Sequence, residues 1–326
     1  MNKNVYKELL SDHLRDIFDS RDLPLYGMMS YHFGFHESEL EFTPAYLHGI
    51  SLLLATEAFG NSEKSAISAA AAVELINGFC EIHDDVQSGR PSKYGRDSLW
   101  WVWGPAQAIN AGDGMHALAR TELLLLANKG FEPEMSYHAI KLFDEATLKS
   151  CEGRFRDLDM QEKLDVSIEA YTKMASEKAG SLLGGTLAVA ALLSNKDEDA
   201  QVELIHSGAL LGEAIQIKSD LNQLWNVSEN QNVDFLNKKK LYPVVLAMQK
   251  ASASEKRKLG EVYFKRVLES EDINVVRGIV EDLGSKDEAE KRFKTCIDQV
   301  DEILNKYIDD KNMYDDLRTF LMDNIG

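Results

Sequence analysis

The sequence predicts an all-α fold, and three observations carry that prediction. Proline, which interrupts helices, occurs only six times in 326 residues. Long segments place apolar residues at positions i, i+3, i+4 and i+7, as in residues 66–76, and this spacing is typical of one face of a helix. No stretch alternates apolar and polar residues between hairpin turns, so β-structure should be marginal or absent.

Residues that favour turns divide the helical segments. Breaks are expected near residues 60–62, 88–97, 129–130, 194–199 and 226–237. None of these breaks is long enough to be a domain linker, so residues 1–326 should form a single domain. The segments 66–87 and 203–225 are helical in pattern and rich in Ala and Leu. We expect both to be central helices that are buried on most sides.

Composition excludes several classes of protein. With 44% apolar residues the chain can bury a large core, and its net charge of −18 argues against binding to nucleic acid. No apolar run reaches the roughly 18 residues of a membrane span, and residues 1–20 lack the apolar region of a signal peptide. A cytoplasmic location is therefore expected. The three cysteines are spaced too widely for a disulfide framework or a zinc site.

Two acidic elements follow apolar helical segments. Asp84 and Asp85 follow residues 73–82, and Asp220 follows residues 210–217, so the ends of two helices could face one cavity. Carboxylates in such positions are costly unless they are solvated, paired or bound to metal. Clustered oxygen ligands suit Mg²⁺, which favours a diphosphate as a further ligand. From the spacing alone, Asp84 and Asp85 could equally begin a solvated turn.

The motifs resemble those of a known family. Residues 82–87 (IHDDVQ) and 104–113 (GPAQAINAGD) resemble the aspartate-rich helix and the next helix of the polyprenyl synthetases, the trans-isoprenyl diphosphate synthase family. Further matches follow in the family's order at Gly153 and Asp157, and at 162–167, 178–180, 216–218 and 238–247. The resemblance covers about residues 25–250. It implies an isoprenoid-synthase-type bundle of about ten or more helices around a central apolar cavity.

The resemblance also implies a chemistry. In this family two aspartate-rich motifs hold Mg²⁺ ions, which grip an allylic prenyl diphosphate and stabilise the departing diphosphate. By position, Asp84, Asp85 and Asp220 would be metal ligands, and Lys178 would join Asp84 and Asp85 as a catalytic residue in contact with the diphosphate. The remaining candidates for substrate binding are Gln216, Lys93, Lys238 and Phe79. The bulk of Phe79 would select a short-chain substrate of C10 to C20.

The sequence departs from the family pattern in several places. Ser88 ends the first motif and residues 219–223 read SDLNQ, so three of the six expected carboxylates are absent. Lys93 and Tyr94 stand where the family has two arginines. The cationic stretch that contacts the homoallylic diphosphate aligns with residues 39–44 or close to it, and its three cations are absent. A lysine-bearing loop is shortened to residues 226–230. Chain elongation with isopentenyl diphosphate is therefore not expected.

Two substitutions could compensate for these losses. Glu81 lies one helical turn before Asp84 and Asp85, so its carboxylate should point to the same face and could be a substitute metal ligand. Arg154 stands where the family has glutamine, and its guanidinium would suit a phosphate. The alternative is that Glu81 and Arg154 pair with each other or with neighbouring charges.

Three functions remain open at this point. The first is an enzyme that ionises an allylic prenyl diphosphate, either as a terpene-synthase-like lyase or as a prenyltransferase whose acceptor is not isopentenyl diphosphate. The second is a catalytically inactive regulatory subunit of a heteromeric synthase. The third is a conventional short-chain polyprenyl diphosphate synthase. The resemblance implies an oligomer in each case, either a homodimer or a heterodimer with a related synthase.

Overall fold

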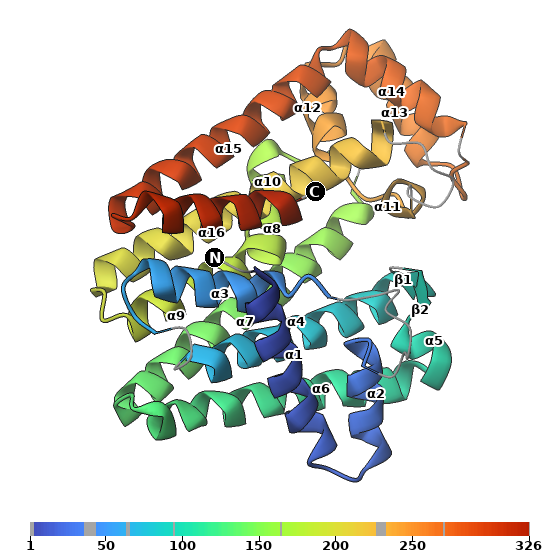
Figure 1. The fold of residues 1–326 in the computed structure, drawn as a ribbon. Coiled ribbons are helices and arrows are strands. Elements are labelled where there is room, and N and C mark those ends of the chain that lie inside the picture. The colour runs from blue at the N-terminus through green and yellow to red at the C-terminus, as the bar shows by residue number, and fades with distance from the viewer. Residues whose placement is uncertain are drawn as a thin grey trace. The chain divides into compact units, whose positions relative to one another are not determined.

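The computed structural model of the chain describes residues 3–35, 44–62, 66–93, 95–163, 165–225, 233–269 and 271–325 (Figure 1). Nearly all of these residues lie in helices, which confirms the prediction of an all-α fold. The described strands are two residues long and pair in antiparallel fashion, with Ser92 opposite Asp97 and Lys93 opposite Arg96. Among the described residues, no helix is both long enough and apolar enough to cross a membrane.

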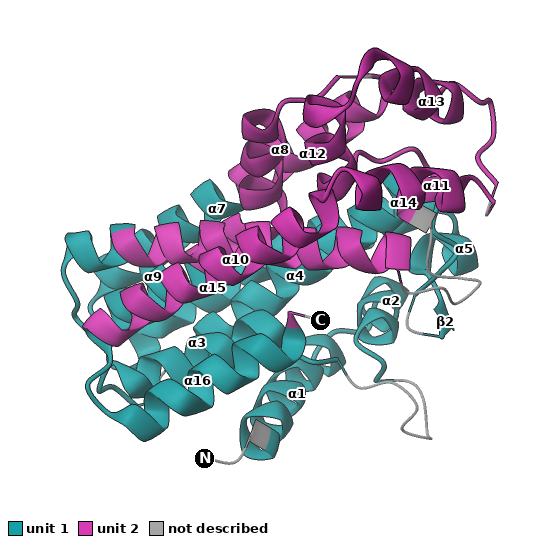
Figure 2. Ribbon diagram, turned by 90° about the horizontal axis from the view of Figure 1, so that it is seen from above, with its two compact units in different colours: residues 1–147, 185–202, 307–324 teal, residues 148–184, 203–306, 325–326 magenta. Residues whose placement is uncertain are grey.

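The chain divides into two compact units, which Figure 2 distinguishes by colour. The first consists of residues 1–147, 185–202 and 307–324, and the second of residues 148–184, 203–306 and 325–326. Three long helices have residues in both units: α7 (Pro133–Gln161), α9 (Ser181–Leu193) and α10 (Glu198–Trp225). The organisation of residues 1–326 as a single domain stays a prediction.

The remaining elements of the first unit come mostly from the N-terminal half of the chain. In chain order they are α1 (Lys3–Asp19), α2 (Pro24–His32), α3 (Leu47–Ala58), α4 (Ile67–Ser88), β1 (Ser92–Lys93), β2 (Arg96–Asp97), α5 (Leu99–Trp103), α6 (Pro105–Leu124), the 3₁₀ helix η2 (Leu125–Lys129) and α16 (Lys311–Asn324). α6 packs along α4 (Figure 1), and α16 packs beside α3 (Figure 2).

The remaining elements of the second unit lie around α10. They are α8 (Ile168–Ala175), the π-helical turn η3 (Ser176–Gly180), α11 (Val233–Leu236), α12 (Tyr242–Lys250), α13 (Ala253–Tyr263), α14 (Asp272–Asp282) and α15 (Ser285–Tyr307). Glycines let two of the long helices touch through their backbones. A Cβ atom on Gly208 would lie only 2.1 Å from the amide nitrogen of Gly184, so no larger residue fits at this crossing of α9 and α10.

α4 is the central helix of the first unit, as its pattern predicted. Residues 68–76 of α4 are all buried, and the run of alanines at 69–72 allows neighbouring helices to approach closely. The helix ends at Gly89, which adopts the left-handed conformation with φ 62° and is followed by the short β1–β2 turn. Asp84 and Asp85 therefore lie in the last turn of a mostly buried helix.

Candidate active site

The negative charges of Asp84 and Asp85 at the end of α4 are offset by nearby cations. The carbonyl end of a helix carries a partial negative charge, so the carboxylates of Asp84 and Asp85 are unfavourable in its last turn. The chain supplies two cations directly after the helix, Arg90 and Lys93. A guanidinium nitrogen of Arg90 lies 3.9 Å from a carboxylate oxygen of Asp85, and the ammonium of Lys93 lies 2.9 Å from Glu81.

Asp85 is the most confined member of this group. Its side chain is buried, and its Oδ1 atom has no hydrogen-bond partner among the described residues. Burial raises the pKa of Asp85 to about 6, although Lys93 and Arg90 both act to lower it. A buried carboxylate oxygen without a donor is unfavourable in the free protein, and it is suited to accept a bound cation.

Glu81 is paired within the protein. Besides Lys93, the imidazole of His32 lies 3.5 Å from the carboxylate. Burial acts to raise the pKa of Glu81, but Lys93 and His32 outweigh it and hold this pKa well below its usual value. The structure thus contains the pairing with neighbouring charges that was the alternative interpretation of Glu81. A role for Glu81 as a metal ligand stays a prediction.

A small cavity of about 30 Å³ adjoins these side chains. Its lining includes His32, Glu81, Asp85, Lys93 and Arg96. Arg96 has a positional role here, because its guanidinium donates to the backbone carbonyls of Tyr31 and His32 at 2.7 and 2.8 Å. These bonds tie the β1–β2 turn to the end of α2, and so they fix the turn that carries Lys93.

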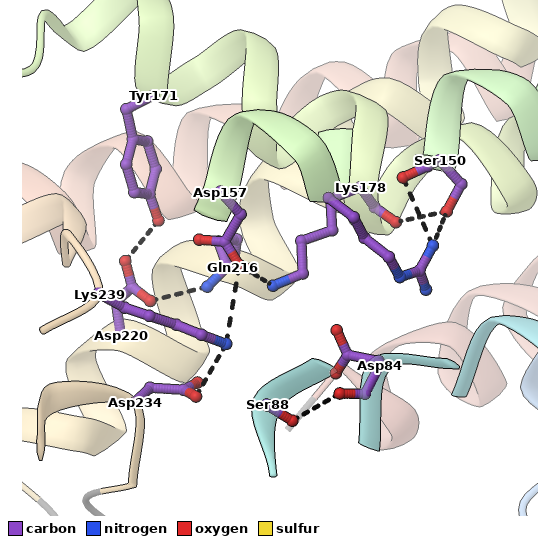
Figure 3. Close-up of polar contacts among 11 residues, drawn as sticks. Asp84, Ser88, Ser150, Asp157, Tyr171, Lys178, Gln216, Asp220, Asp234 and Lys239 are labelled. Carbon is purple, nitrogen blue, oxygen red and sulfur yellow. Dashed lines mark hydrogen bonds and ion pairs between the residues drawn. The ribbon is translucent and has the colours of Figure 1, made fainter. Parts of the chain in front are cut away.

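The other face of α4 near its end is aromatic. The ring of Phe79 lies 4.5 Å from that of His83 and 5.1 Å from that of His116, measured between centroids. The imidazole of His83 lies against α6 at Gly112, where a Cβ atom would come within 2.7 Å of it. Asp84 is half-buried, and its carbonyl accepts a hydrogen bond from the hydroxyl of Ser88 (Figure 3).

The second unit contains its own cluster of charges. Lys178, in the π-helical turn η3, donates to the carboxylate of Asp157 on α7 at 2.6 Å (Figure 3). Gly153 makes this contact possible, because a Cβ atom there would lie 2.3 Å from the backbone nitrogen of Lys178. π-Helical turns often occur at functional sites, and this one places a lysine on a buried aspartate.

Lys239, rather than Lys238, joins this cluster. The ammonium of Lys239 lies 3.7 Å from Asp157 and 2.9 Å from Asp234, and the side chain is buried. Lys238 has a left-handed backbone with φ 61°, and its ammonium instead donates to the backbone carbonyl of Lys265. Lys178 and Lys239, the two lysines of this cluster, are thus paired with Asp157 and Asp234.

Asp220 is enclosed by hydrogen-bond donors. Its carboxylate accepts from the hydroxyl of Tyr171, from the backbone N–H of Tyr242 at 2.6 Å, and from the amide of Gln216 at 2.8 Å (Figure 3). The residue is only 1% exposed. Burial raises its pKa to about 7, although all three donors act to lower it. These bonds connect α10 with α8 and α12.

Arg154 also has a protein partner, because its guanidinium donates to the hydroxyl of Ser150 one turn earlier on α7, at 2.6 Å. Ser150 in turn donates to the backbone carbonyl of Lys178 at 3.2 Å. The described partners of Glu81 are Lys93 and His32. The role of Arg154 as a phosphate contact stays a prediction.

The candidate residues fit a divalent metal unequally. Asp84 and Asp85 supply oxygen ligands, and Asp85 has an oxygen without a described donor. Asp220, by contrast, accepts three donors and is almost fully enclosed. Within the described part of the chain, no three side chains of the His, Cys, Asp or Glu type come together as a metal-binding group. The acidic end of α4 therefore fits the ion better than the region around Asp220.

Sequence reasoning missed several members of both clusters. Arg90 and His32 were not identified as partners of the acidic residues, although Arg90 directly follows α4. In the sequence, Asp157 stands out only through the family match that it shares with Gly153. Lys239 stands out only as the middle lysine of residues 238–240, at the start of the matching segment 238–247. The position of Asp157 four residues after Gly153, on the same helical face, was a signal that could have identified it.

Comparison with known proteins agrees with this fold and these motifs. Residues 45–282 match the family described as polyprenyl synthetase. The chain is 30% identical over 247 residues to geranylgeranyl diphosphate synthase of Mycobacterium tuberculosis, covering 73% of this chain and 69% of that protein. It is 28% identical over 263 residues to (2E,6E)-farnesyl diphosphate synthase of Mycobacterium bovis, covering 77% of this chain and 70% of the relative.

Solved structures resemble the chain over nearly its whole length. Polyprenyl synthetase from Streptomyces coelicolor A3(2) superposes with a TM-score of 0.86 at 25% identity, covering 99% of this chain and 98% of the other. Geranylgeranyl pyrophosphate synthetase from Pyrococcus horikoshii superposes with a TM-score of 0.83 at 24% identity, covering 97% and 94%. With the family match over most of its length, the chain belongs to the polyprenyl synthetase family.

Proposed function

We propose that the protein acts on an allylic prenyl diphosphate at the acidic end of α4 and transfers the prenyl group to an acceptor other than isopentenyl diphosphate. The observation that carries the first half of this proposal is the buried Asp85 carboxylate, whose Oδ1 lies 3.9 Å from a guanidinium nitrogen of Arg90 but has no hydrogen-bond donor among the described residues. The relatives named as prenyl diphosphate synthases support the substrate class.

Mg²⁺ belongs to this proposal, with Asp84 and Asp85 as the residues that would hold it. The ion would offset the negative charge that grows on a departing diphosphate. The protein's own contribution is to keep the two carboxylates in place at the end of a buried helix, with Arg90 and Lys93 near enough to limit their mutual repulsion. Glu81 remains a candidate further ligand, which would require release of its pairing with Lys93.

Lys178 and Lys239 are proposed as contacts of the diphosphate. Lys178 and Lys239 share Asp157 as an ionic partner, and a phosphate could replace that carboxylate because it offers the same kind of oxygen acceptor. Lys238, Gln216 and Arg154 remain candidates for substrate contacts. Gln216 would have to give up its bond to Asp220 to play this part.

The choice of acceptor rests on a cavity in the first unit. Residues 39–43, part of the stretch that aligns with the family's homoallylic diphosphate contacts, lie outside the described residues. Pro44, the next residue, lines a cavity of about 320 Å³. Its described lining contains Glu74 and Glu81 and no Lys or Arg, so it is poorly suited to a diphosphate.

Two alternatives keep specific support. A conventional short-chain synthase is favoured by the relatives, which are named geranylgeranyl and farnesyl diphosphate synthases. An inactive regulatory subunit is favoured by the enclosure of Asp220, which leaves one of the two acidic motifs without an accessible carboxylate. For all three functions we propose a homodimer or a heterodimer with a related synthase.

The test is release of pyrophosphate from geranyl, farnesyl and geranylgeranyl diphosphate in the presence of Mg²⁺, with water taking the place of the acceptor and the prenyl alcohol as the second product. We expect release from at least one substrate and its loss in Asp84→Ala. The matched control is Asp144→Asn, which changes a half-buried carboxylate paired with Arg120 in the same unit; this variant should release pyrophosphate at the normal rate. Incorporation of labelled isopentenyl diphosphate would identify a conventional synthase, and absence of release from all three substrates would favour the regulatory subunit.

A further inference from the structure

The cavity on which the choice of acceptor rests also indicates a class of ligand. It has a volume of about 320 Å³ and is lined by residues from α2, α3, α4 and α16, among them His32, Tyr46, His48, Glu74, Asn77 and Glu81. This volume corresponds to about ten water molecules at the density of the liquid, which is enough for a small organic molecule. Glu81 and His32 also line the small cavity beside Asp85, so the two cavities share part of their walls.

Apart from Tyr46, the ionisable side chains in the described lining of this cavity are glutamates and histidines. Glu74 and Glu81 both line it, and its described lining contains no Lys or Arg. Lys93, the cationic partner of Glu81, lines the smaller cavity instead. Glu74 is 3% exposed and accepts the backbone N–H of Gly49 at 2.6 Å, near the N-terminus of α3. Burial nevertheless raises the pKa of Glu74 to about 8, because this N–H group does not offset the loss of solvation of its charge. Glu74 is therefore mostly protonated near pH 7, and a bound cation would favour its ionised form.

His48 supplies an unpartnered polar atom. The residue lines the cavity and is only 9% exposed, and its Nδ1 atom has no hydrogen-bond partner in the described part of the chain. Burial lowers the pKa of His48 to about 4, so the imidazole is neutral at physiological pH and one of its nitrogens is an acceptor. A buried polar atom of this kind is expected to meet a water molecule or a ligand.

The cavity also has an aromatic wall. Phe33 and Tyr46 both line it, and their rings are stacked with centroids 6.3 Å apart and planes at 25° to each other. The face of an aromatic ring attracts cations, and it binds them more strongly where water is excluded. Two glutamate side chains, an imidazole acceptor and aromatic side chains together favour a positively charged molecule with N–H donors, and they disfavour an anion.

We propose that this cavity binds a small organic cation with N–H donors, a primary ammonium or a guanidinium group, and that it excludes diphosphates. This proposal rests on the proposed function in one respect. The bound cation is the polar end of the acceptor that receives the prenyl group. Glu74, Glu81 and the imidazole of His48 receive the N–H groups, and Phe33 and Tyr46 cover the carbon atoms of the ligand.

The experiment measures binding of n-butylammonium chloride to the full chain by saturation-transfer NMR, with n-butanol and inorganic pyrophosphate as comparison probes. Two substitutions at half-buried Asn77 provide opposite charges at one position of the lining. Asn77→Asp is isosteric and should tighten binding of butylammonium about fivefold, while Asn77→Lys should abolish it, since charges at close range in a partly buried site interact at this level. Thermal unfolding of both variants verifies that they fold.

Asp316→Asn is the control for general attraction to an acidic surface. Asp316 lies in the same unit and lines a different acidic cavity, together with Glu57 and Asp310. Its substitution should leave binding of butylammonium unchanged. Three results would overturn the proposal: no binding of butylammonium, binding that is equal in both Asn77 variants, or saturable binding of pyrophosphate that Asn77→Asp weakens.

Failure of this inference can be distinguished from failure of the proposed function. If the protein releases pyrophosphate from a prenyl diphosphate but binds no butylammonium, the function stands and the cation site is wrong. If butylammonium binds with the expected dependence on Asn77 while no prenyl diphosphate is cleaved, the site stands and the enzymatic function is wrong.

Discussion

Replacing Asp220 distinguishes a structural carboxylate from a metal ligand. Asp220→Ala would leave three donors without an acceptor: the buried hydroxyl of Tyr171, the buried backbone N–H of Tyr242 and the amide of half-buried Gln216. Each unsatisfied buried donor costs about 1–3 kcal/mol, and the Gln216 amide can turn toward other partners. We therefore expect Asp220→Ala to lower the free energy of unfolding by about 3–5 kcal/mol.

Asp220→Asn should behave very differently. The asparagine oxygen can keep the two donors that converge on Oδ2, those of Tyr171 and Tyr242. The new NH₂ group can donate to the Gln216 side-chain oxygen once that amide turns over. Because burial already raises the pKa of Asp220 to about 7, the loss of its charge is inexpensive near neutral pH. We expect a change in unfolding free energy of less than about 1 kcal/mol.

The assay is urea unfolding at pH 7, followed by far-ultraviolet circular dichroism and analysed by linear extrapolation. Tyr171→Phe is the matched control, because it removes one donor and leaves the other two on Asp220; it should cost about 1 kcal/mol. Equal and large destabilisation by Asp220→Asn and Asp220→Ala would refute the reasoning, since it would mean that the charge, and not the acceptor geometry, stabilises the fold.

The remaining predictions concern Gly153 and Glu74. Gly153→Ala should destabilise the second unit by about 2 kcal/mol or more, because its Cβ would lie 2.3 Å from the Lys178 backbone nitrogen; urea unfolding measures this, and a neutral outcome would contradict the close contact. Burial raises the pKa of Glu74 to about 8 from 4.5, so the folded state binds its proton more tightly than the unfolded state does. The resulting stability is fully present below pH 4.5 and is lost as pH rises toward 8. Glu74→Gln should flatten the stability profile in this window, measured as unfolding temperature from pH 5 to pH 8.5; an unchanged slope would contradict the assignment.

The long helices could be predicted from the sequence because the burial of a helix places apolar residues at helical spacing along it. The predicted segment 66–87 corresponds to α4 (Ile67–Ser88), and 203–225 lies within α10 (Glu198–Trp225). Both helices are apolar over most of their surface, so the pattern is clear even though the ends differ by a few residues. The position of Asp84 and Asp85 at the end of α4 could be predicted for the same reason, since they come directly after its apolar residues.

The partners of the candidate residues could not be predicted in the same way. Which lysine of the run joins Asp157 depends on the left-handed backbone of Lys238, which turns neighbouring side chains in different directions. Two of the three donors on Asp220 come from helices about 50 residues before it and about 20 after it, and no local pattern of the sequence indicates such contacts. The unpartnered nitrogen of His48 is likewise a property of packing.

The acidic end of α4 as the diphosphate site is the central claim, and rates of pyrophosphate release from prenyl diphosphates with Mg²⁺ test it most directly. The proteins to compare are the unmodified chain, Asp85→Asn and Asp220→Asn, each verified as folded. We expect the unmodified chain and Asp220→Asn to release pyrophosphate at similar rates. The rate of release by Asp85→Asn should be lower by at least about 100-fold, as when a group that stabilises only the transition state is removed. Release by Asp85→Asn at the rate of the unmodified chain would contradict the claim.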